Sequence, residues 1–349
     1  MLSPTVLSAV SAHVRWPGAS ITSQGSSAMA YISPTLSLLS VVLATASAAL
    51  LPRYTGPLPE SELPPAVAAR VLNTSATSTN ASNILVFGDS FGTTGPTYRV
   101  ITDVFKKYDS PAHVESTAIG GTSACQWAYY SNGTSLASMA YKKFPKSGPD
   151  FVWYTLAAND LAQDRGYHRC MSQAKSMAAA KGCLAQANKR ILQCTEWLLD
   201  TLFYYYPDTK VMHTGYDIPC EGEICRHTID TAFTGTFCDS NSHWWKSGND
   251  YYTCVNSLFA EFQQIHHAAL QAKYPPKNYV PLNFLGTVQA AAGVKGAQVG
   301  KPVLSQGSKC SWEVLCVHPK YGTPAATAWG QAMWDFFFSK QPGLPRGTR

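Results

Sequence analysis

The chain has 349 residues, of which 45% are hydrophobic and 14% are charged, and its formal net charge is +6. This composition is typical of one large globular domain with a sizeable core, and it excludes disorder along the whole chain. The positive charge is mild and scattered, without the basic stripe that nucleic-acid-binding proteins carry. We therefore expect no nucleic-acid partner.

The first 48 residues are interpreted as an extension followed by a secretory signal peptide. The stretch LSLLSVVLATASA at 36–48 is apolar, ends in the small residues that signal cleavage requires, and is short for a membrane span. Met29 opens a more ordinary signal than Met1 does. No later stretch offers the roughly 18 uncharged apolar residues of a membrane helix. We expect a secreted protein without stable membrane insertion.

Residues 49–82 are predicted to form a linker, because they are rich in Pro, Ser, Thr and Ala and lack an apolar period. The globular domain is predicted to span residues 83–349. Within it, short apolar stretches alternate with longer helical ones. This alternation favours a parallel sheet with helices on both faces. The expected strands lie at 83–88, 112–119, 150–157, 209–216 and 278–286, and the expected helices at 96–108, 188–206, 257–274 and 324–338.

Two segments, 162–187 and 217–255, do not fit the alternation and contain six of the ten cysteines. Both are predicted to be disulfide-rich surface insertions, and the second is suited to form a lid or rim over a site. Trp244 and Trp245 in the second segment either stack on a sugar or acyl chain or pack within the insertion's own small core.

All ten cysteines follow the predicted signal peptide, an even number that fits up to five disulfides in an oxidising compartment. No Cys-x-x-Cys pair is present, so we expect no structural zinc site. Two bridges are predicted, Cys310–Cys316 across a short loop and Cys238–Cys254 across a longer one. Glycosylation sequons agree with a secreted glycoprotein; they begin at Asn73, Asn80 and Asn132.

The stretch ILVFGDSFGTTG at 84–95 carries Ser90 directly after an apolar strand, between Gly88 and Gly92. A serine at the C-terminal end of a strand in an open α/β sheet lies where such folds bind ligands. Ser90 has two competing interpretations, a simple turn residue and the Gly-x-Ser-x-Gly elbow of an α/β-hydrolase. The elbow follows several strands, whereas Ser90 follows the first recognisable one.

Four blocks in order resemble those of the SGNH hydrolases, also called GDSL-type esterases and lipases. The blocks are VFGDSFG at 86–92, AIGGTSA at 118–124, LAANDL at 156–161 and VHP at 317–319. The resemblance spans residues 83 to about 338. It implies a flavodoxin-like α/β fold, which is a three-layer sandwich with a central parallel sheet.

The resemblance implies a role for each block. Ser90 would attack an ester carbonyl after His318 takes its proton. The N–H groups of Ser90 and Gly121 and the side chain of Asn159 would form the oxyanion hole. Gly120 is the alternative to Gly121 after a shift of one residue.

Each role has an ordinary competitor. Asn159 could merely cap the next helix, and Asp89 is predicted to be structural, bonding backbone amides of its turn. Only His318 stands in a His-Pro pair just before the last helix. The other histidines after the signal are His113, His168, His213, His227, His243, His266 and His267.

The family usually has an aspartate three residues before the histidine, where this sequence has Leu315. Something else must orient the imidazole. Glu313 on the same loop is predicted to serve as the acid that reaches Nδ1 of His318. The alternatives are a backbone carbonyl and an insertion residue such as Asp217.

The predicted function is a secreted serine esterase that hydrolyses carboxylic esters of lipid or acylated carbohydrate through an acyl-serine intermediate. Its expected partner is a small-molecule or polysaccharide ester, and no metal or organic cofactor is expected. Two alternatives remain. One is an acyltransferase that uses the same acyl-enzyme, and the other is a non-catalytic glycan or lipid binder with the same fold.

Overall fold

The computed structural model describes residues 81–93, 97–131, 133–222, 225, 228–240, 248–314, 316–342 and 344. All of these belong to one compact unit, which begins after residue 49. The predicted signal peptide, the predicted linker up to residue 80, the three sequon asparagines, Trp244 and Trp245 lie outside the described residues.

The central sheet has five parallel strands in the order β2-β1-β3-β4-β5. This is the flavodoxin-like order, and all five predicted strands are confirmed. Ile84 of the central strand β1 aligns with Val114 on one side and with Phe151 on the other. The strands are β1 (Ser82–Phe87), β2 (Ala112–Ser116), β3 (Phe151–Tyr154), β4 (Lys210–Thr214) and β5 (Tyr279–Leu282).

Strand β1 is buried along its whole length. Ile84 and Val86 belong to the core on one face of the sheet, and Leu85 and Phe87 belong to the core on the other. A strand buried on both faces needs an apolar side chain at every position. This explains the unbroken apolar run before Ser90.

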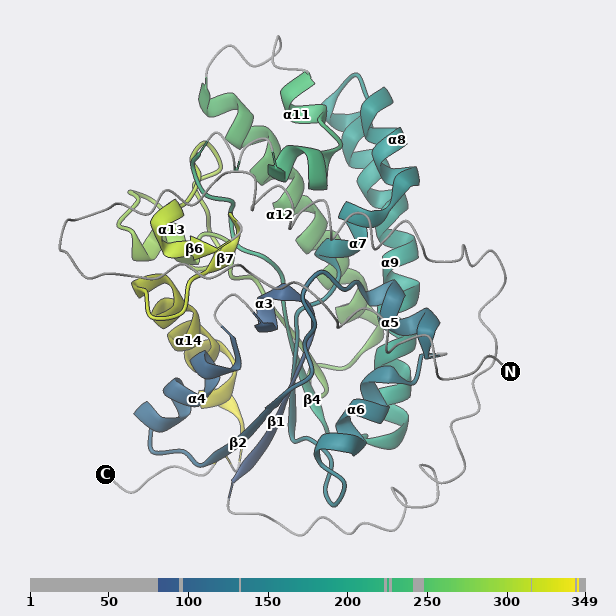
Figure 1. Ribbon diagram of the computed structural model, residues 1–349, viewed down its shortest axis with the longest axis vertical. Coiled ribbons are helices and arrows are strands. Elements are labelled where there is room, and N and C mark those ends of the chain that lie inside the picture. Colours follow the sequence, from purple (N-terminus) through teal and green to yellow (C-terminus); the bar gives the residue numbers. More distant parts are fainter. Residues whose placement is uncertain are drawn as a thin grey trace, which may run out of the picture. The chain divides into compact units, whose positions relative to one another are not determined.

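Helices cover both faces of the sheet and give three layers (Figure 1). On one face, α4 (Thr97–Lys107) packs against α14 (Pro324–Phe336). Gly330 permits this close approach, because a Cβ there would lie 2.7 Å from Cγ1 of Val100. On the other face lie α5 (Ala124–Tyr130), α6 (Ser135–Lys143) and α9 (Met177–Tyr205).

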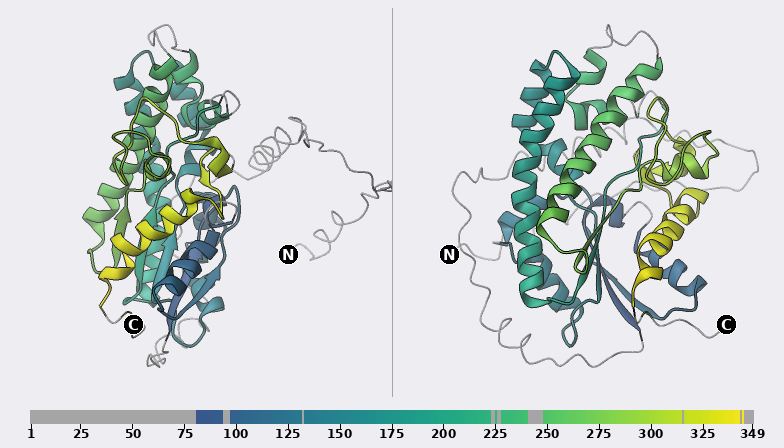
Figure 2. Two further views of the ribbon diagram at one scale, coloured as in Figure 1. Left: turned by 90° about the vertical axis from the view of Figure 1, so that its left-hand side faces the viewer. Right: turned by 180° about the vertical axis from the view of Figure 1, so that it is seen from behind.

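Two long helices, α9 and α12 (Gly248–Lys273), run side by side (Figure 2). Both begin earlier than predicted. Ser176 caps α9 by accepting a hydrogen bond from the N–H of Ala179, and the residues that follow are rich in alanine, which favours a helix. A disulfide between Cys170 and Cys183 joins α9 to the preceding helix α8 (Arg165–Gln173).

The two segments predicted as surface insertions contribute to the main core. Tyr167 and Met171 from the first segment, and Phe237 and Cys254 from the second, are at most 1% exposed. The prediction that these segments lie on the surface is therefore wrong for their helical parts. The prediction relied on the cysteines of these segments and did not consider their apolar residues, which complete the core.

Several short elements follow the strands and bring the predicted site residues to the carboxyl edge of the sheet. Helix α3 follows β1, α7 follows β3, and a two-stranded antiparallel hairpin precedes α14. The short elements are α3 (Ser90–Thr93), α7 (Ala158–Gln163), the π-helix η2 (Asp230–Thr234), α11 (Phe237–Ser240), α13 (Thr287–Ala291), the 3-10 helices η4 (Cys310–Trp312) and η5 (Phe338–Lys340), and the hairpin strands β6 (Glu313–Val314) and β7 (His318–Pro319).

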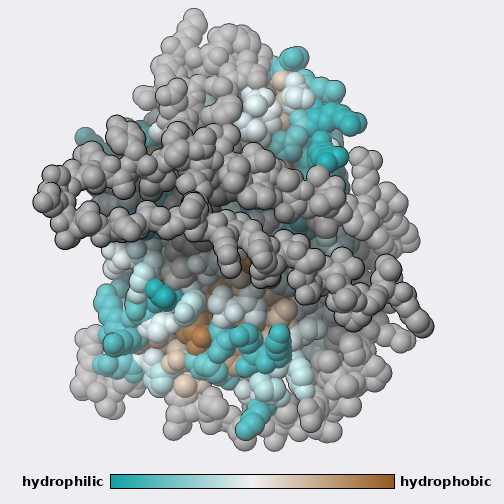
Figure 3. Space-filling model, viewed as in Figure 1, coloured by the Kyte–Doolittle hydropathy of each residue, from teal (hydrophilic) through white to brown (hydrophobic). Residues whose placement is uncertain are grey.

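On the face shown in Figure 3, the described surface is mostly hydrophilic, with small hydrophobic areas among the polar ones. Among the described helices, none is both long enough and apolar enough to span a membrane. Large apolar side chains that are exposed come from several elements; they are Tyr98, Ile119, Tyr129, Tyr130, Tyr204, Tyr321 and Phe336.

Candidate active site

Ser90 lies at the carboxyl end of β1, where it is the first residue of α3. Strands β2 and β3 flank β1 on opposite sides, so this is the switch point at which open α/β sheets bind ligands. At Gly88 the backbone comes very close to Thr155, which directly follows β3. A Cβ on Gly88 would lie 1.8 Å from Thr155 Oγ1, so only glycine fits at this position.

The Ser90 hydroxyl lies 2.7 Å from Nε2 of His318, although 228 positions separate the two residues. Both side chains are buried, and His318 is only 3% exposed. The imidazole ring packs beside two aromatic rings, at centroid distances of 5.1 Å from Phe91 and 5.4 Å from Tyr216. The structure thus brings together the predicted nucleophile and the predicted base.

Two disulfides tie the region of His318 to the segment that follows β4. They join Cys220 to Cys310 and Cys225 to Cys316. The predicted Cys310–Cys316 bridge is therefore wrong. Nearness along the chain suggested that pairing, whereas the fold places each cysteine beside a partner about 90 positions away, at separations of 90 and 91.

The predicted Cys238–Cys254 bridge is confirmed. Two further bridges join Cys125 to Cys194 and Cys170 to Cys183, so every cysteine of the chain is paired. Three sulfur atoms gather within 4.8 Å of one another, those of Cys220, Cys225 and Cys310. Because all three belong to disulfides, they offer no thiolate to a metal ion.

The glycine block lies beside Ser90. A Cβ on Gly120 would lie 3.9 Å from the Ser90 Cβ, whereas a Cβ on Gly121 would meet nothing within 4 Å. Gly121 has a positive φ of 78°, which favours glycine for conformational reasons. Its carbonyl accepts a hydrogen bond from Gln163 on α7 at 2.8 Å, which fixes the loop.

Asn159 lies on α7, and its side chain reaches the glycine block and Asp89. The N-cap of this helix is Ala157, without a side-chain cap bond, so the helix-cap interpretation of Asn159 is wrong. The Asn159 amide donates instead to the Thr122 carbonyl at 3.0 Å and to Asp89 Oδ2 at 3.2 Å. Its N–H groups therefore lie between the glycine block and the residue before Ser90.

Asp160, next to Asn159, fastens α7 to α5. Its two carboxylate oxygens accept hydrogen bonds from the backbone N–H groups of Ala124 and Cys125, at 2.8 and 2.9 Å. A carboxylate is favourable at a helix N-terminus. Burial nevertheless raises the pKa of Asp160 to about 7. Sequence analysis missed this role, although the Asn-Asp pair in LAANDL marked its position.

Asp89 is fully buried and is structural, as predicted, because it accepts a hydrogen bond from the backbone N–H of Phe91 at 3.0 Å. It also accepts bonds from side chains of Thr155, Asn159 and Tyr216. Burial raises the pKa of Asp89 to about 7, while the Phe91, Tyr216 and Thr155 bonds oppose the rise. All four partners donate, which suits the ionised carboxylate.

Neither carboxylate considered for orienting His318 is bonded to it. Glu313 bonds to the Ser308 hydroxyl through one oxygen, and its other oxygen has no hydrogen-bond partner. Asp217 accepts bonds from three backbone N–H groups and from the Trp329 indole N–H. The predicted role of Glu313 as the acid partner of His318 is therefore not supported, and Asp217 serves the core.

The other histidines that the structure describes have their partners away from Ser90. His113 on β2 contacts Glu115, and His168 bonds to the Ala162 carbonyl. Three others are buried near the end of β4 and on α12, where burial lowers their pKa values; they are His213, His266 and His267. His227 and His243 lie outside the described residues.

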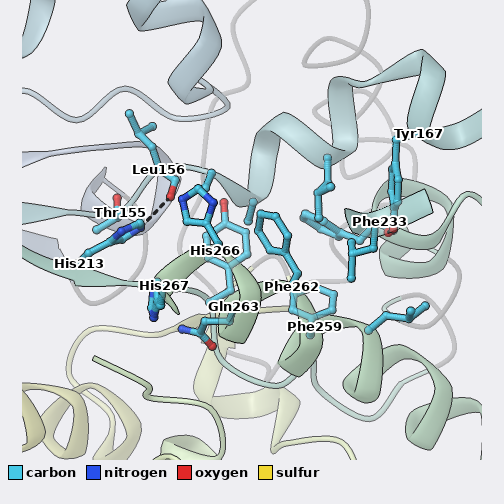
Figure 4. Close-up of a pocket in the computed structure, with 17 residues that line it drawn as sticks. Thr155, Leu156, Tyr167, His213, Phe233, Phe259, Phe262, Gln263, His266 and His267 are labelled. Atoms are coloured by element: carbon cyan, nitrogen blue, oxygen red, sulfur yellow. Dashed lines mark hydrogen bonds between the residues drawn. The ribbon is translucent and has the colours of Figure 1, made fainter. Parts of the chain in front are cut away.

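A cavity of about 30 Å³ lies behind the site, between α7, α12 and the ends of β3 and β4 (Figure 4). Aromatic side chains, including Phe233, Phe259 and Phe262, line one part of it, and the histidines of α12 line another. Neither amide atom of Gln263 has a hydrogen-bond partner there, although this side chain is only 6% exposed. Tyr216 separates the cavity from Asp89, since it lines the cavity and bonds to that carboxylate.

No protein-family model and no curated protein matches the chain, but solved structures do. An extracellular lipase from Streptomyces rimosus is 12% identical over 73% of this chain and 99% of its own, with a TM-score of 0.40. A GDSL-like lipase from Parabacteroides merdae is 13% identical over 74% and 97%, with a TM-score of 0.40. An acetylxylan esterase from Geobacillus stearothermophilus is 10% identical over 74% and 94%, with a TM-score of 0.37.

Because these TM-scores are all below 0.5, the likeness carries no argument by itself, and the function of the chain has to be inferred from the geometry around Ser90. The order of the four sequence blocks, the flavodoxin-like strand order and the contact between Ser90 and His318 all agree with the predicted resemblance. The chain has a flavodoxin-like α/β fold with a central five-stranded parallel sheet.

Proposed function

We propose that the chain is a secreted serine esterase that hydrolyses carboxylic esters through an acyl-Ser90 intermediate. The observation that carries this proposal is the 2.7 Å contact between the Ser90 hydroxyl and Nε2 of His318. A serine hydroxyl becomes an effective nucleophile when a positioned base takes its proton. Secretion is supported by five disulfides, which persist in oxidising compartments.

In the proposed reaction, Ser90 Oγ attacks the ester carbonyl carbon while His318 Nε2 accepts the hydroxyl proton. The oxygen that becomes negative accepts hydrogen bonds from the N–H groups of Ser90 and Gly121 and from the Asn159 amide. It takes the place of the Thr122 carbonyl, which accepts from that amide here.

His318 then gives its proton to the leaving alkoxide, and the acyl group stays on Ser90. Water attacks the acyl carbon while His318 accepts its proton; the bond to Ser90 Oγ then breaks, His318 returns the proton to that oxygen, and the acid product is released. Neither Glu313 nor Asp217 is bonded to the imidazole, so the proposed reaction uses Ser90 and His318 without either carboxylate as the acid.

The test uses p-nitrophenyl esters of increasing acyl length, acetylated polysaccharides and a fluorophosphonate probe. We expect Ser90→Ala to abolish both hydrolysis and labelling, and Ser138→Ala, which changes a half-buried serine of α6, to preserve both. Unchanged labelling of Ser90→Ala would refute the nucleophile. A folded wild-type protein that neither reacts with the probe nor cleaves any ester would favour the non-catalytic binder. Acyl transfer to an added sugar in place of hydrolysis would favour the acyltransferase.

A further inference from the structure

Tyr216 lies where the predicted catalytic groups meet, two residues after β4, and it is 4% exposed. Its hydroxyl donates to Asp89 Oδ2 at 2.7 Å and lies 3.3 Å from Asn159 Oδ1. The Ser90 hydroxyl is a further hydrogen-bonding neighbour of the phenol. Sequence analysis gave this tyrosine no role.

The ring of Tyr216 contacts the other side of the site. It stacks on Phe91 with a centroid distance of 5.0 Å and an interplanar angle of 18°. It also meets the His318 imidazole at 5.4 Å. The Tyr216 side chain therefore contacts the predicted base His318, the predicted oxyanion donor Asn159 and Phe91, the residue after the predicted nucleophile.

Asp89 links Tyr216 to Asn159, because one carboxylate oxygen, Oδ2, accepts from both the phenol and the Asn159 amide. The ionised carboxylate only accepts hydrogen bonds, whereas protonation turns one of its oxygens into a donor and so disturbs the four bonds that Asp89 accepts here. The phenol supplies one of the bonds that lower the pKa of this buried group against the effect of burial. Loss of the phenol hydroxyl would therefore weaken the hold of Asp89 on Asn159.

We propose that Tyr216 is a positioning residue for the esterase reaction: through Asp89 its hydroxyl holds the Asn159 amide in place to bind the oxyanion. The proposal rests on the proposed function. It predicts that Tyr216 and Asn159 act as one unit in catalysis, so that their substitutions are not additive. A tyrosine that only filled space would affect stability without this coupling.

The test combines Tyr216→Phe, which keeps the ring, with Asn159→Ala, alone and together. Removing one oxyanion donor costs roughly 10²–10³ in kcat, and we expect Tyr216→Phe to cost at least about tenfold with little change in KM. In the Asn159→Ala background, Tyr216→Phe should have almost no further effect on kcat. An equal loss in both backgrounds, or no loss in the wild type, would overturn the proposal.

A matched control is Tyr167→Phe. Tyr167 is also a buried tyrosine that lines the cavity, but its hydroxyl donates to the Phe233 carbonyl at 2.6 Å, away from Ser90. We expect this variant to lose thermal stability and to keep the wild-type kcat. A kcat loss in Tyr167→Phe equal to that in Tyr216→Phe would mean that any lost buried hydroxyl has the same effect, and it would overturn the proposal.

The pH profile gives a second readout. Removing the phenol should raise the pKa of Asp89 further and shift the acid limb of kcat to higher pH. Other titratable groups face Asp89: Asp160, Tyr154 and, across Ser90, His318. Burial holds the Tyr154 pKa above its ordinary value, so it stays neutral. Asp160 titrates near the same pH as Asp89 but shares no hydrogen bond with Tyr216.

If Tyr216→Phe does not fold, Thr155→Val removes a different donor to Asp89 at Oδ1 and leaves the aromatic ring in place. The acid limb should then move in the same direction, and an unmoved limb would overturn the proposed link through Asp89.

Fluorophosphonate labelling keeps the two proposals apart. A wild type that is not labelled refutes the esterase, whereas a labelled wild type with an unaffected Tyr216→Phe variant refutes only the role of Tyr216.

Discussion

Across the β6–β7 hairpin, His318 is paired with Val314, and Glu313 is paired with Pro319. Neighbouring residues of a strand point to opposite faces, so Glu313 and the imidazole lie on different faces of the hairpin. Burial raises the pKa of Glu313 well above its ordinary value, which favours the neutral form of the side chain. Glu313 therefore acts as a structural group bonded to Ser308.

Glu313→Gln should keep kcat within about threefold of the wild type, because a glutamine resembles a protonated glutamic acid in shape and bonding. Steady-state kinetics at several substrate concentrations would measure this. Losing the acid of a catalytic triad can cost about 10⁴ in kcat. A loss approaching that size, with KM unchanged, would show that Glu313 orients His318 after all.

The sheet could be predicted from sequence because its signals are local, whereas the pairing of Ser90 with His318 was implied by the resemblance of the four blocks to the SGNH hydrolases. The apolar run at 84–87 indicates a buried strand by itself, and Ser90 follows it directly. His318 stands in a His-Pro pair before a helix that begins with Thr323 and Pro324. Such patterns depend on neighbours along the chain, which the sequence displays.

Other features depend on partners that the sequence does not display. The phenol of Tyr216 bonds to Asp89, which is 127 positions away, and Cys225 pairs with a cysteine 91 positions away. Only the packed fold decides such pairings, so the short Cys310–Cys316 loop misled the prediction. The role of Glu313 failed for a similar reason, because the pairing of β6 with β7 decides the direction of its side chain.

The bridge between Cys225 and Cys316 should matter for catalysis as well as for stability, because Cys316 lies two residues before His318. The double variant Cys225→Ser/Cys316→Ser keeps the Cys220–Cys310 bridge and so keeps one attachment of the hairpin. We expect it to lose about 2–5 kcal/mol of unfolding free energy and to have a lower kcat, measured by urea unfolding and by ester hydrolysis.

The matched control is Cys170→Ser/Cys183→Ser, which removes a bridge between α8 and α9 with a sequence separation of 13. It should lose unfolding free energy too, but its kcat should stay at the wild-type level at temperatures where the protein is folded. If both pairs lower kcat by the same factor, the Cys225–Cys316 bridge has no special role in holding His318.

Two buried glutamines differ in their partners and should respond oppositely to substitution by methionine. Neither amide atom of Gln263 has a hydrogen-bond partner, whereas the amide of Gln289 bonds to the backbone of Val303, Gln306 and Gly307. A buried polar group without a partner costs about 1–3 kcal/mol. Gln263→Met should therefore leave the melting temperature unchanged or raise it, and Gln289→Met should lower it.

Thermal unfolding of the two variants beside the wild type measures this difference. A lower melting temperature for Gln263→Met, comparable to that of Gln289→Met, would mean that the Gln263 amide makes hydrogen bonds after all. Ordered water in the cavity is the natural partner in that case, because a volume of about 30 Å³ has room for it.

The buried histidines predict how acid affects stability. Burial lowers the pKa of His213 from 6.5 to about 4, so between these values the unfolded chain binds more protons than the folded protein. The contribution of His213 to the free energy of unfolding is therefore fully present above pH 6.5 and is lost as the pH falls toward 4. His266 and His267 act in the same direction. The raised pKa values of Asp89, Asp160 and Asp217 act in the opposite direction, so the pH dependence of the whole protein cannot isolate one histidine.

A difference measurement isolates His213. We expect the unfolding free energy of the wild type minus that of His213→Asn to fall by about 3 kcal/mol between pH 7 and pH 4, because each pKa unit corresponds to about 1.4 kcal/mol. Urea unfolding of both proteins at several pH values provides both curves. A flat curve for His213→Asn would mean that His213 binds its proton equally well in the folded and unfolded states, contrary to its burial between β4 and α12.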